Sequence, residues 1–318
     1  MSGQTSIEWT DATWNVVTGC TKVSTGCKNC YAERVSLRTF ANQTIVEDVG
    51  DDSSIVRKRI FTDVLIHPNR LEQPLHWRKP ARIFVNSMSD LFHEEVPFEF
   101  IDQIFGVMAA CTQHSFQILT KRPVRMKSYI LYWLAQQDGR ESPSGTVKPL
   151  HNVWLGVSCE DQKTADERIP LVLQTPAAIR FVSYEPALES VDFGCVPWPS
   201  GWRNKNDIIS DGIDPLRFNR RHLDWIIVGG ESGPGARPFN INWARSVIDQ
   251  CKASGLACFM KQLGRNPYEA PPGITPSTSG PDSIKCRLWN LDIDKSHGGD
   301  WTEWPEDLKV RQYPDIKT

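Results

Sequence analysis

The chain has 318 residues, of which 40% are hydrophobic and 23% charged, as in a folded globular protein. One α/β barrel of about 250 residues fits within this length. The formal net charge is −2, so the protein as a whole carries no excess of positive charge that would attract nucleic acid or anionic membranes. A local basic patch could still bind either of them. No stretch reaches the roughly 20 apolar residues of a membrane span, and the first residues do not resemble a signal peptide. We therefore expect a cytoplasmic protein with no membrane partner.

Short apolar runs alternate with amphipathic segments along most of the chain. The pattern predicts strands at 13–18, 82–86, 116–120, 153–158, 179–184, 224–228 and 257–261, with an extra strand at 61–66. It predicts helices at 29–40, 97–111, 123–137 and 243–253, and one from about 162 that Pro170 interrupts or restarts. Strand–helix repetition predicts an α/β fold with a parallel sheet of six to seven strands, either an open doubly wound sheet or a partial or full (β/α) barrel.

Two insertions and a tail depart from this alternation. The stretch near 43–80 contains a charged Asp/Ser-rich excursion over the surface, and the stretch near 186–222 is a Pro-rich loop in place of a helix. After residue 263 the chain is rich in Pro, Gly and Ser, and Trp301 and Trp304 indicate that it packs on the sheet. We predict a barrel over 1–263 and an irregular extension over 264–318.

Polar groups follow each predicted strand at its carboxyl end. Parallel α/β folds build their active sites at this edge, so the set favours a site there. For each residue alone, a helix cap or a solvated loop charge is the competing interpretation. The residues are Cys20; Ser87 and Asp90; Lys121; Ser158 and Glu160; Glu185; Glu231; and Lys261.

The loop at 19–34 has a spacing typical of metal ligands. Its cysteines, Cys20, Cys27 and Cys30, are spaced C-x6-C-x2-C, whereas the other six cysteines are scattered. Thiolates bind iron or zinc, but a structural zinc site needs four protein ligands, and the nearest histidine is His67. Three thiolates leave one position open, which on a [4Fe-4S] cluster can take a small molecule. An iron–sulfur cluster, zinc completed by a distant residue and thiols without metal are the three interpretations.

The same loop carries a family resemblance. The segments at 13–20, 26–34, 226–238 and 304–311 resemble the phage-associated three-cysteine-motif proteins, a radical-SAM-like family of largely unassigned function. The resemblance implies a radical-SAM-type barrel in which Cys20, Cys27 and Cys30 hold a [4Fe-4S] cluster that binds S-adenosylmethionine. Reductive cleavage of that cofactor would yield a deoxyadenosyl radical. The chain departs from the commonest superfamily pattern in its six-residue first gap and in Asn29 before the third cysteine.

In an enzyme of this type, the polar residues at the strand ends are the candidates for cofactor and substrate contacts. Contacts to the cofactor are expected from Ser87, Asp90, Ser158 and Glu160. Roles on the substrate side are expected from Lys121, Glu185, Glu231 and Lys261. The phage association implies a nucleic acid or nucleotide substrate. The basic runs 57–59 and 217–221 are candidates for phosphate contacts, with solvated surface as the more common role of such runs.

Two alternative functions fit the same residues. The first is a non-enzymatic protein with bound zinc or an iron–sulfur cluster, whose barrel binds a partner protein. The second is a nuclease or hydrolase in which divalent metal ions are held by carboxylates, since hard cations favour oxygen ligands. Its ligands would be Asp90, Glu160, Glu185 and Glu231.

Overall fold

A computed structural model describes residues 5–50, 53–137, 148–197, 222–270, 289–290 and 298–315. The chain forms two compact units, residues 1–155 and 156–318. The boundary falls inside strand β8 (Val153–Cys159).

A seven-stranded sheet has the order β1-β6-β7-β8-β9-β10-β12. The remaining strands are β1 (Ala12–Trp14), β6 (Arg82–Val85), β7 (Ser115–Thr120), β9 (Ile179–Tyr184), β10 (Trp225–Gly229) and β12 (Ala257–Gln262). The pairs β1–β6, β6–β7, β9–β10 and β10–β12 are parallel. In the described part of the chain β1 and β12 are the two edges, so the order is that of a partial barrel. The α/β class with six to seven parallel strands is confirmed.

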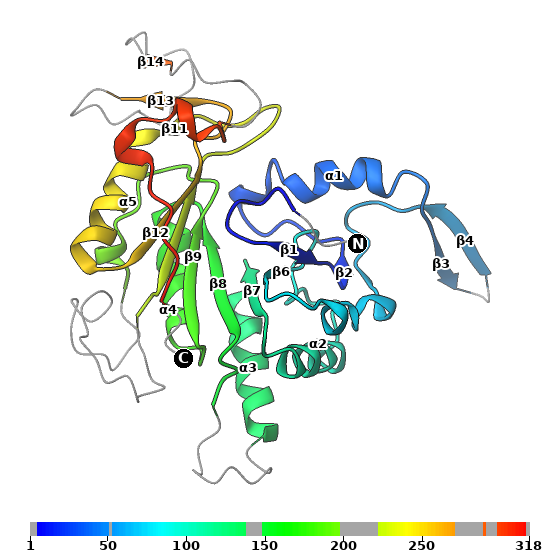
Figure 1. The fold of residues 1–318 in the computed structure, drawn as a ribbon. Helices are drawn as coiled ribbons and strands as arrows, with labels where there is room; N and C mark the ends of the chain where they lie inside the picture. Colours follow the sequence, from blue (N-terminus) through cyan, green and yellow to red (C-terminus); the bar gives the residue numbers. More distant parts are fainter. Residues whose placement is uncertain are drawn as a thin grey trace. The chain divides into compact units, whose positions relative to one another are not determined.

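The core of the first unit lies between the sheet and two helices, α2 (Phe98–Ala110) and α3 (Pro123–Gln137), seen below β6 and β7 in Figure 1. Trp14 and Phe116 are fully buried, with ring centroids 5.8 Å apart. Ile101, Phe105 and Met108 of α2 are buried at helical spacing. Proline at the first position of α3 fits because that residue needs no backbone donor.

The first predicted strand is wrong in its extent. The run at 13–18 divides into β1 and a separate β2 (Val17–Thr18), which pairs antiparallel with β5 (Leu65–Ile66). Asn86, the one described non-glycine residue with positive φ (62°), lies just after β6 and accepts the Val17 amide through its side chain at 3.0 Å. The Val17 amide is therefore bonded to a side chain that follows β6. Of the extra strand predicted at 61–66, only the two residues of β5 form a strand.

The insertion near 43–80 contains more regular structure than the sequence indicates. Helix α1 (Tyr31–Thr39) leads into an antiparallel hairpin of β3 (Thr44–Gly50) and β4 (Ser53–Lys58), which extends away from β1 and β2 (Figure 1). Two short 3-10 helices follow, η2 (Pro68–Arg70) and η3 (Gln73–His76). The sequence did not predict this hairpin because the acidic and serine residues of 47–54 are typical of a surface loop.

The second unit packs α4 (Gln162–Leu173) and α5 (Ile241–Ser254) with β9, β10 and β12. Helix α4 runs through Pro170 without a break, so the predicted interruption is wrong. Asp161 caps the start of the helix, and the Gln174 amide bonds to the Pro170 carbonyl at its end. The tail contributes short pairings: β13 (Pro267–Glu269) pairs with β11 (Phe239–Asn240) and β14 (Trp289–Asn290).

Three 3-10 helices, η4 (Phe193–Cys195), η6 (Trp301–Glu303) and η7 (Glu306–Leu308), complete the described second unit. Trp304 is buried, as its position in a packed tail requires. Most of the predicted insertion at 186–222, including Arg217, Arg220 and Arg221, lies outside the described residues, and so does much of the extension after residue 263. The predicted boundary at residue 263 stays a prediction. In the described residues no helix has the length and apolarity to cross a membrane.

Candidate metal and cofactor site in the cysteine loop

Each of the three loop cysteines occupies a defined place in the first unit. Cys20 follows β2, Cys27 ends the 3-10 helix η1 (Thr25–Cys27), and Cys30 is the N-cap residue of α1. All three are free thiols and half-buried. Cys30 thus lies at the positive end of the α1 dipole, a position that suits bound negative charge.

Gly19 sets the entry of the chain into the loop. Its φ is +96°, and a Cβ at this position would meet the Asp63 carbonyl oxygen at 2.2 Å. The Gly19 amide bonds to the Met88 carbonyl, and the Cys20 amide bonds to the Phe61 carbonyl. Only glycine fits both the backbone angle and the close approach, so the glycine fixes where Cys20 begins.

Asp90, just after β6, is buried and accepts hydrogen bonds through both carboxylate oxygens. The Thr120 hydroxyl donates at 2.7 Å, the Lys121 amide at 3.0 Å and the Phe92 amide at 3.0 Å. The Arg122 guanidinium completes the set at 3.3 Å. Asp90 therefore fastens the end of β6 to the end of β7.

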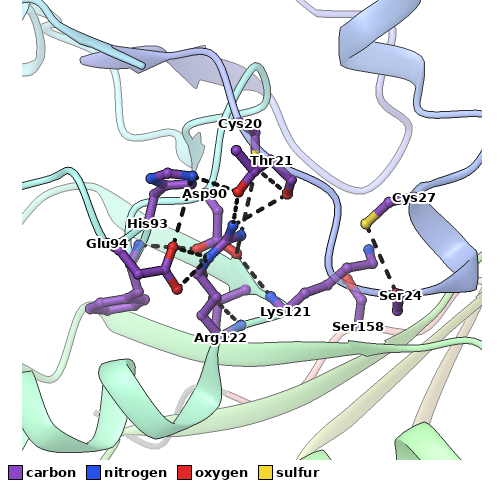
Figure 2. Close-up of polar contacts among 12 residues, drawn as sticks. Cys20, Thr21, Ser24, Cys27, Asp90, His93, Glu94, Lys121, Arg122 and Ser158 are labelled. Carbon is purple, nitrogen blue, oxygen red and sulfur yellow. Dashed lines mark hydrogen bonds and ion pairs between the residues drawn. The ribbon is translucent and has the colours of Figure 1, made fainter. Parts of the chain in front are cut away.

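The Arg122 guanidinium lies at the centre of this network (Figure 2). It is buried, pairs with Asp90 and Glu94, and donates to the Thr21 hydroxyl at 2.8 Å. Its Nη1 is 3.6 Å from the Cys20 sulfur. A positive charge is thus held directly against the first cysteine.

Thr21 and His93 support the loop from the other side. The Thr21 hydroxyl lies 2.8 Å from His93 Nε2, and His93 is buried. Burial and the charge of Arg122 lower the pKa of His93, against the opposing carboxylates. His93 is therefore held neutral near pH 7 and can serve the hydroxyl as donor or acceptor, according to its tautomer.

The environments of Cys20 and Cys27 differ in their effect on the thiols. Burial and the charge of Asp90 raise the pKa of Cys20 to about 11, against the lowering effect of Arg122. At Cys27 burial also raises the pKa, but the Lys121 charge and the hydrogen bonds from Val23 and Ser24 outweigh it, and the net shift is downward. Figure 2 shows the Lys121 side chain extending toward Cys27.

The three loop cysteines are the candidate metal ligands of this site. Within the described ranges no group of three His, Cys, Asp or Glu residues is arranged to hold one metal ion. In an iron–sulfur cluster each thiolate ligates its own iron, so the three sulfurs lie further apart than around one ion. The three thiols are half-buried, and the cations beside Cys20 and Cys27 suit a negatively charged centre.

The four residues predicted to contact the cofactor fall in both units. Ser87 and Asp90 belong to the first, where the Ser87 hydroxyl lies 3.2 Å from the Asn15 side-chain oxygen. Ser158 and Glu160 belong to the second and are buried. Glu160 is 0% exposed and pairs with Arg168 of α4 at 2.8 Å, and the same Arg168 atom donates to the Ser158 carbonyl at 2.7 Å. The Glu160 carboxylate therefore serves an internal ion pair in this structure.

The residues predicted on the substrate side also divide between the units. Lys121 is in the first unit beside Cys27. In the second unit Glu185 and Lys261 form an ion pair at 2.6 Å, and the Gln262 side chain donates to the same carboxylate oxygen at 3.0 Å. The structure thus brings Glu185 and Lys261 together at the ends of β9 and β12.

Glu231 is engaged separately. Arg237 binds its carboxylate through two guanidinium nitrogens, at 2.6 and 3.0 Å, and through its own amide at 2.9 Å. This closes the Gly-rich turn after β10. Because Asp90, Glu160, Glu185 and Glu231 all bond to basic side chains, the structure gives no support to a carboxylate-metal nuclease.

Sequence analysis missed the central position of Arg122 and the contributions of Thr21 and His93. The positions of Asp90 and Arg122 just after neighbouring strands were a usable signal, since parallel strands end at one edge. The signal did not show which of Lys121 and Arg122 would turn toward Asp90. No pattern in the sequence indicated that Thr21 would meet His93.

A sequence profile described as "Protein of unknown function (DUF5131)" matches residues 4–295. Among curated proteins, none matches the chain. A solved structure titled "Spore photoproduct lyase complexed with dinucleoside spore photoproduct" aligns with a TM-score of 0.37 and 10% identity, over 80% of this chain. This chain spans 65% of that protein's chain. A similarity this distant assigns neither activity nor ligand.

Proposed function

The chain belongs to the DUF5131 family, and we propose that it is an iron–sulfur enzyme of radical-SAM-like type. In this proposal Cys20, Cys27 and Cys30 hold a [4Fe-4S] cluster. The arrangement that carries the proposal is a set of three free, half-buried thiols in one loop, with Arg122 3.6 Å from the first and Lys121 beside the second. When bound, the cluster supplies one electron for the reductive cleavage of S-adenosylmethionine.

The protein's own residues would hold and tune that centre. Arg122 and Lys121 offset the negative charge of a thiolate-bound cluster, which favours its reduced form. Asp90 keeps Arg122 in place, so it acts as a positioning residue for the loop as well as a proposed cofactor contact. Gly19 fixes the approach of Cys20.

The remaining roles are proposals of the same kind. Ser87, Ser158 and Glu160 would contact S-adenosylmethionine, although Glu160 would first have to leave Arg168. Lys121, Glu185, Glu231 and Lys261 would act toward the substrate. We propose a nucleic acid or nucleotide as that substrate and leave a role for a partner protein open to test. The family resemblance alone supports this substrate class.

Anaerobic reconstitution with iron and sulfide tests the proposal. The wild-type protein should gain a broad visible absorption band, and with a reductant it should form 5′-deoxyadenosine from S-adenosylmethionine. Single Cys20→Ala, Cys27→Ala and Cys30→Ala variants should lose the product. Cys195→Ala, which removes an exposed cysteine outside the loop, is the matched control and should keep it. A reduced cluster that never cleaves S-adenosylmethionine would refute the enzymatic part and leave a cluster-binding protein.

A further inference from the structure

A cavity of about 430 Å³ lies within the first unit. Its walls come from the N-terminal segment, β1, β2, helix α1, Arg59 after β4, Arg70 of η2, and Ser87 and Met88 after β6. The volume falls in the range of small-molecule sites. Its fifteen lining residues include two arginines but no aspartate, glutamate or cysteine.

Arg59 is 5% exposed and held rigidly in this wall. Its guanidinium lies 3.6 Å from the centre of the Phe40 ring, and it donates to the Thr18 hydroxyl at 2.6 Å and to the Gln43 side-chain oxygen at 2.8 Å. Its Nε is buried and has no hydrogen-bond partner within the described ranges. The guanidinium is thus fixed by neutral groups and keeps one donor unused.

Arg70 contributes a second, more available guanidinium. The described part of the chain gives its side chain one hydrogen bond, from Nη1 to the Asn15 carbonyl at 2.9 Å. Arg59 and Arg70 lie close enough for each charge to act on the same neighbour: with burial, they lower the pKa of His67 to about 4. Two like charges thus line the same cavity and act on each other.

Within the described residues neither guanidinium forms an ion pair with a carboxylate. The Asp63 charge acts on Arg59, but the Asp63 carboxylate accepts two hydrogen bonds from Arg57, and the hydrogen bond that Arg59 donates to Asp63 goes to its backbone carbonyl. For Arg70, burial lowers the pKa with no compensating anion. Buried arginines are ordinarily paired, so a cavity lined by two guanidiniums that lack a direct ion pair among the described residues has the electrostatics of an anion site.

The remaining walls indicate what the anion would be attached to. Hydroxyls of Thr13 and Ser87 offer neutral polar contacts, while Ile7, Val35 and Met88 give apolar surface. A free phosphate ion would fill only a small part of about 430 Å³. The cavity suits an anionic group joined to a larger, partly apolar body.

We propose that this cavity binds the phosphate group of a phosphorylated organic molecule of about nucleotide size, with Arg70 as the principal phosphate ligand and Arg59 as the fixed second charge. Guanidinium forks match phosphate oxygens in geometry as well as charge. The proposal is independent of the cysteine loop, because no cysteine lines the cavity.

Isothermal titration with three probes tests this site: adenosine 5′-monophosphate, adenosine and inorganic phosphate. The monophosphate should bind, adenosine should bind at least about tenfold more weakly, and inorganic phosphate should compete weakly. Arg70→Gln should weaken binding of the monophosphate by about tenfold or more, as expected for the loss of a charged hydrogen-bond donor. Arg38→Gln removes an exposed arginine of α1 that does not line the cavity, and it should leave the affinity unchanged.

A second variant keeps the test independent of any folding defect in Arg70→Gln. Val35→Glu would place a carboxylate on the α1 wall, pair with the arginines and abolish binding while its circular dichroism stays that of the wild type. The Cys20, Cys27 and Cys30 alanine variants should bind the monophosphate normally, which separates this site from the proposed cluster. Equal affinity for adenosine and its monophosphate, or unchanged affinity in folded Arg70→Gln, would overturn the phosphate site. Inorganic phosphate binding as tightly as the monophosphate would overturn the organic part of the ligand.

Discussion

The cysteine loop of the first unit and the carboxylates of the second both follow strand ends, yet they differ in what their polar groups are free to do. In the second unit Glu160, Glu185 and Glu231 are each bonded to an arginine or lysine at 2.6–2.8 Å. In the first unit Cys20, Cys27 and Cys30 remain free, half-buried thiols, and the nearby cations face them. Strand-end polarity alone therefore does not mark a binding site, because the carboxylate pairs stabilise the fold while the thiols keep their ligand capacity.

The largest expected effect is on stability, in the buried pair of the second unit. Glu160→Ala should lower the free energy of unfolding by about 3–5 kcal/mol, because it leaves the Arg168 guanidinium buried with no carboxylate. Urea denaturation followed by circular dichroism measures this change. Glu167→Ala, in an exposed pair with Lys163 on the same helix, is the control and should change stability by at most about 0.5 kcal/mol. Comparable losses in the two variants would show that the Glu160 pair is no more structural than a surface contact.

Arg122→Gln should have a smaller effect on stability and a specific effect on the loop. We expect a loss of about 2–3 kcal/mol, since Asp90 keeps three other hydrogen-bond donors when the guanidinium is removed. The pKa of the Cys20 thiol should rise further, because Arg122 lowers it in the wild type. Chemical denaturation and thiol titration measure the two quantities. Arg122→Lys keeps the charge, so a Cys20 pKa that rises equally in both variants would contradict the electrostatic explanation.

The metal-free protein should show unequal reactivity within the loop. At pH 8 iodoacetamide should alkylate Cys27 at least about tenfold faster than Cys20, because the pKa of Cys27 is lowered while that of Cys20 is about 11. The Cys20 thiolate is the more nucleophilic of the two once formed, but this offsets only part of the difference in thiolate fraction. Below its pKa each thiol is protonated, so both rates should fall as the pH falls, and Cys27 should retain reactivity to a lower pH. Peptide mapping by mass spectrometry follows both sites.

Lys121→Met extends the same comparison. Removing the ammonium takes away the largest influence that lowers the pKa of Cys27, so the alkylation of Cys27 at pH 8 should slow severalfold while that of Cys20 stays nearly constant. If Cys20 proves the faster thiol in the wild type, or if Lys121→Met leaves Cys27 unaffected, the charge distribution described for the loop is incorrect.

The strands of the main sheet were predictable because their apolar runs are buried and separated by clear helix or turn signals. Val153–Cys159 and Ile179–Tyr184 are buried at every position, and most of their residues are apolar. The hairpin at 44–58 was not predictable in this way: Val46 and Val56 pair across it but are each 69% exposed, so its residues look like those of a surface loop. A helix through Pro170 likewise depends on bonds outside the proline that the sequence pattern does not show.

The sequence predicted which residue type would serve as metal ligand, but it did not predict the contacts that surround the loop. This difference has a physical cause. The spacing of three cysteines identified the loop, and strand order explains why Asp90 and Arg122 meet. The sequence did not show which polar residues would form ion pairs inside the protein, because this depends on the direction in which each side chain points. Glu160 and Glu231 show this, since their partners Arg168 and Arg237 lie eight and six residues further along the chain and no periodic pattern links them.

The most direct test of this account is the metal and sulfide content of the anaerobically reconstituted protein and its variants. Wild type, Glu185→Gln and Glu231→Gln should each bind iron and acid-labile sulfide in stoichiometric amounts. The combined Cys20→Ala, Cys27→Ala and Cys30→Ala variant should bind neither while remaining folded. Stoichiometric zinc in place of iron in the wild type, or iron retained by the triple cysteine variant, would contradict the assignment of the cysteine loop as the cluster site.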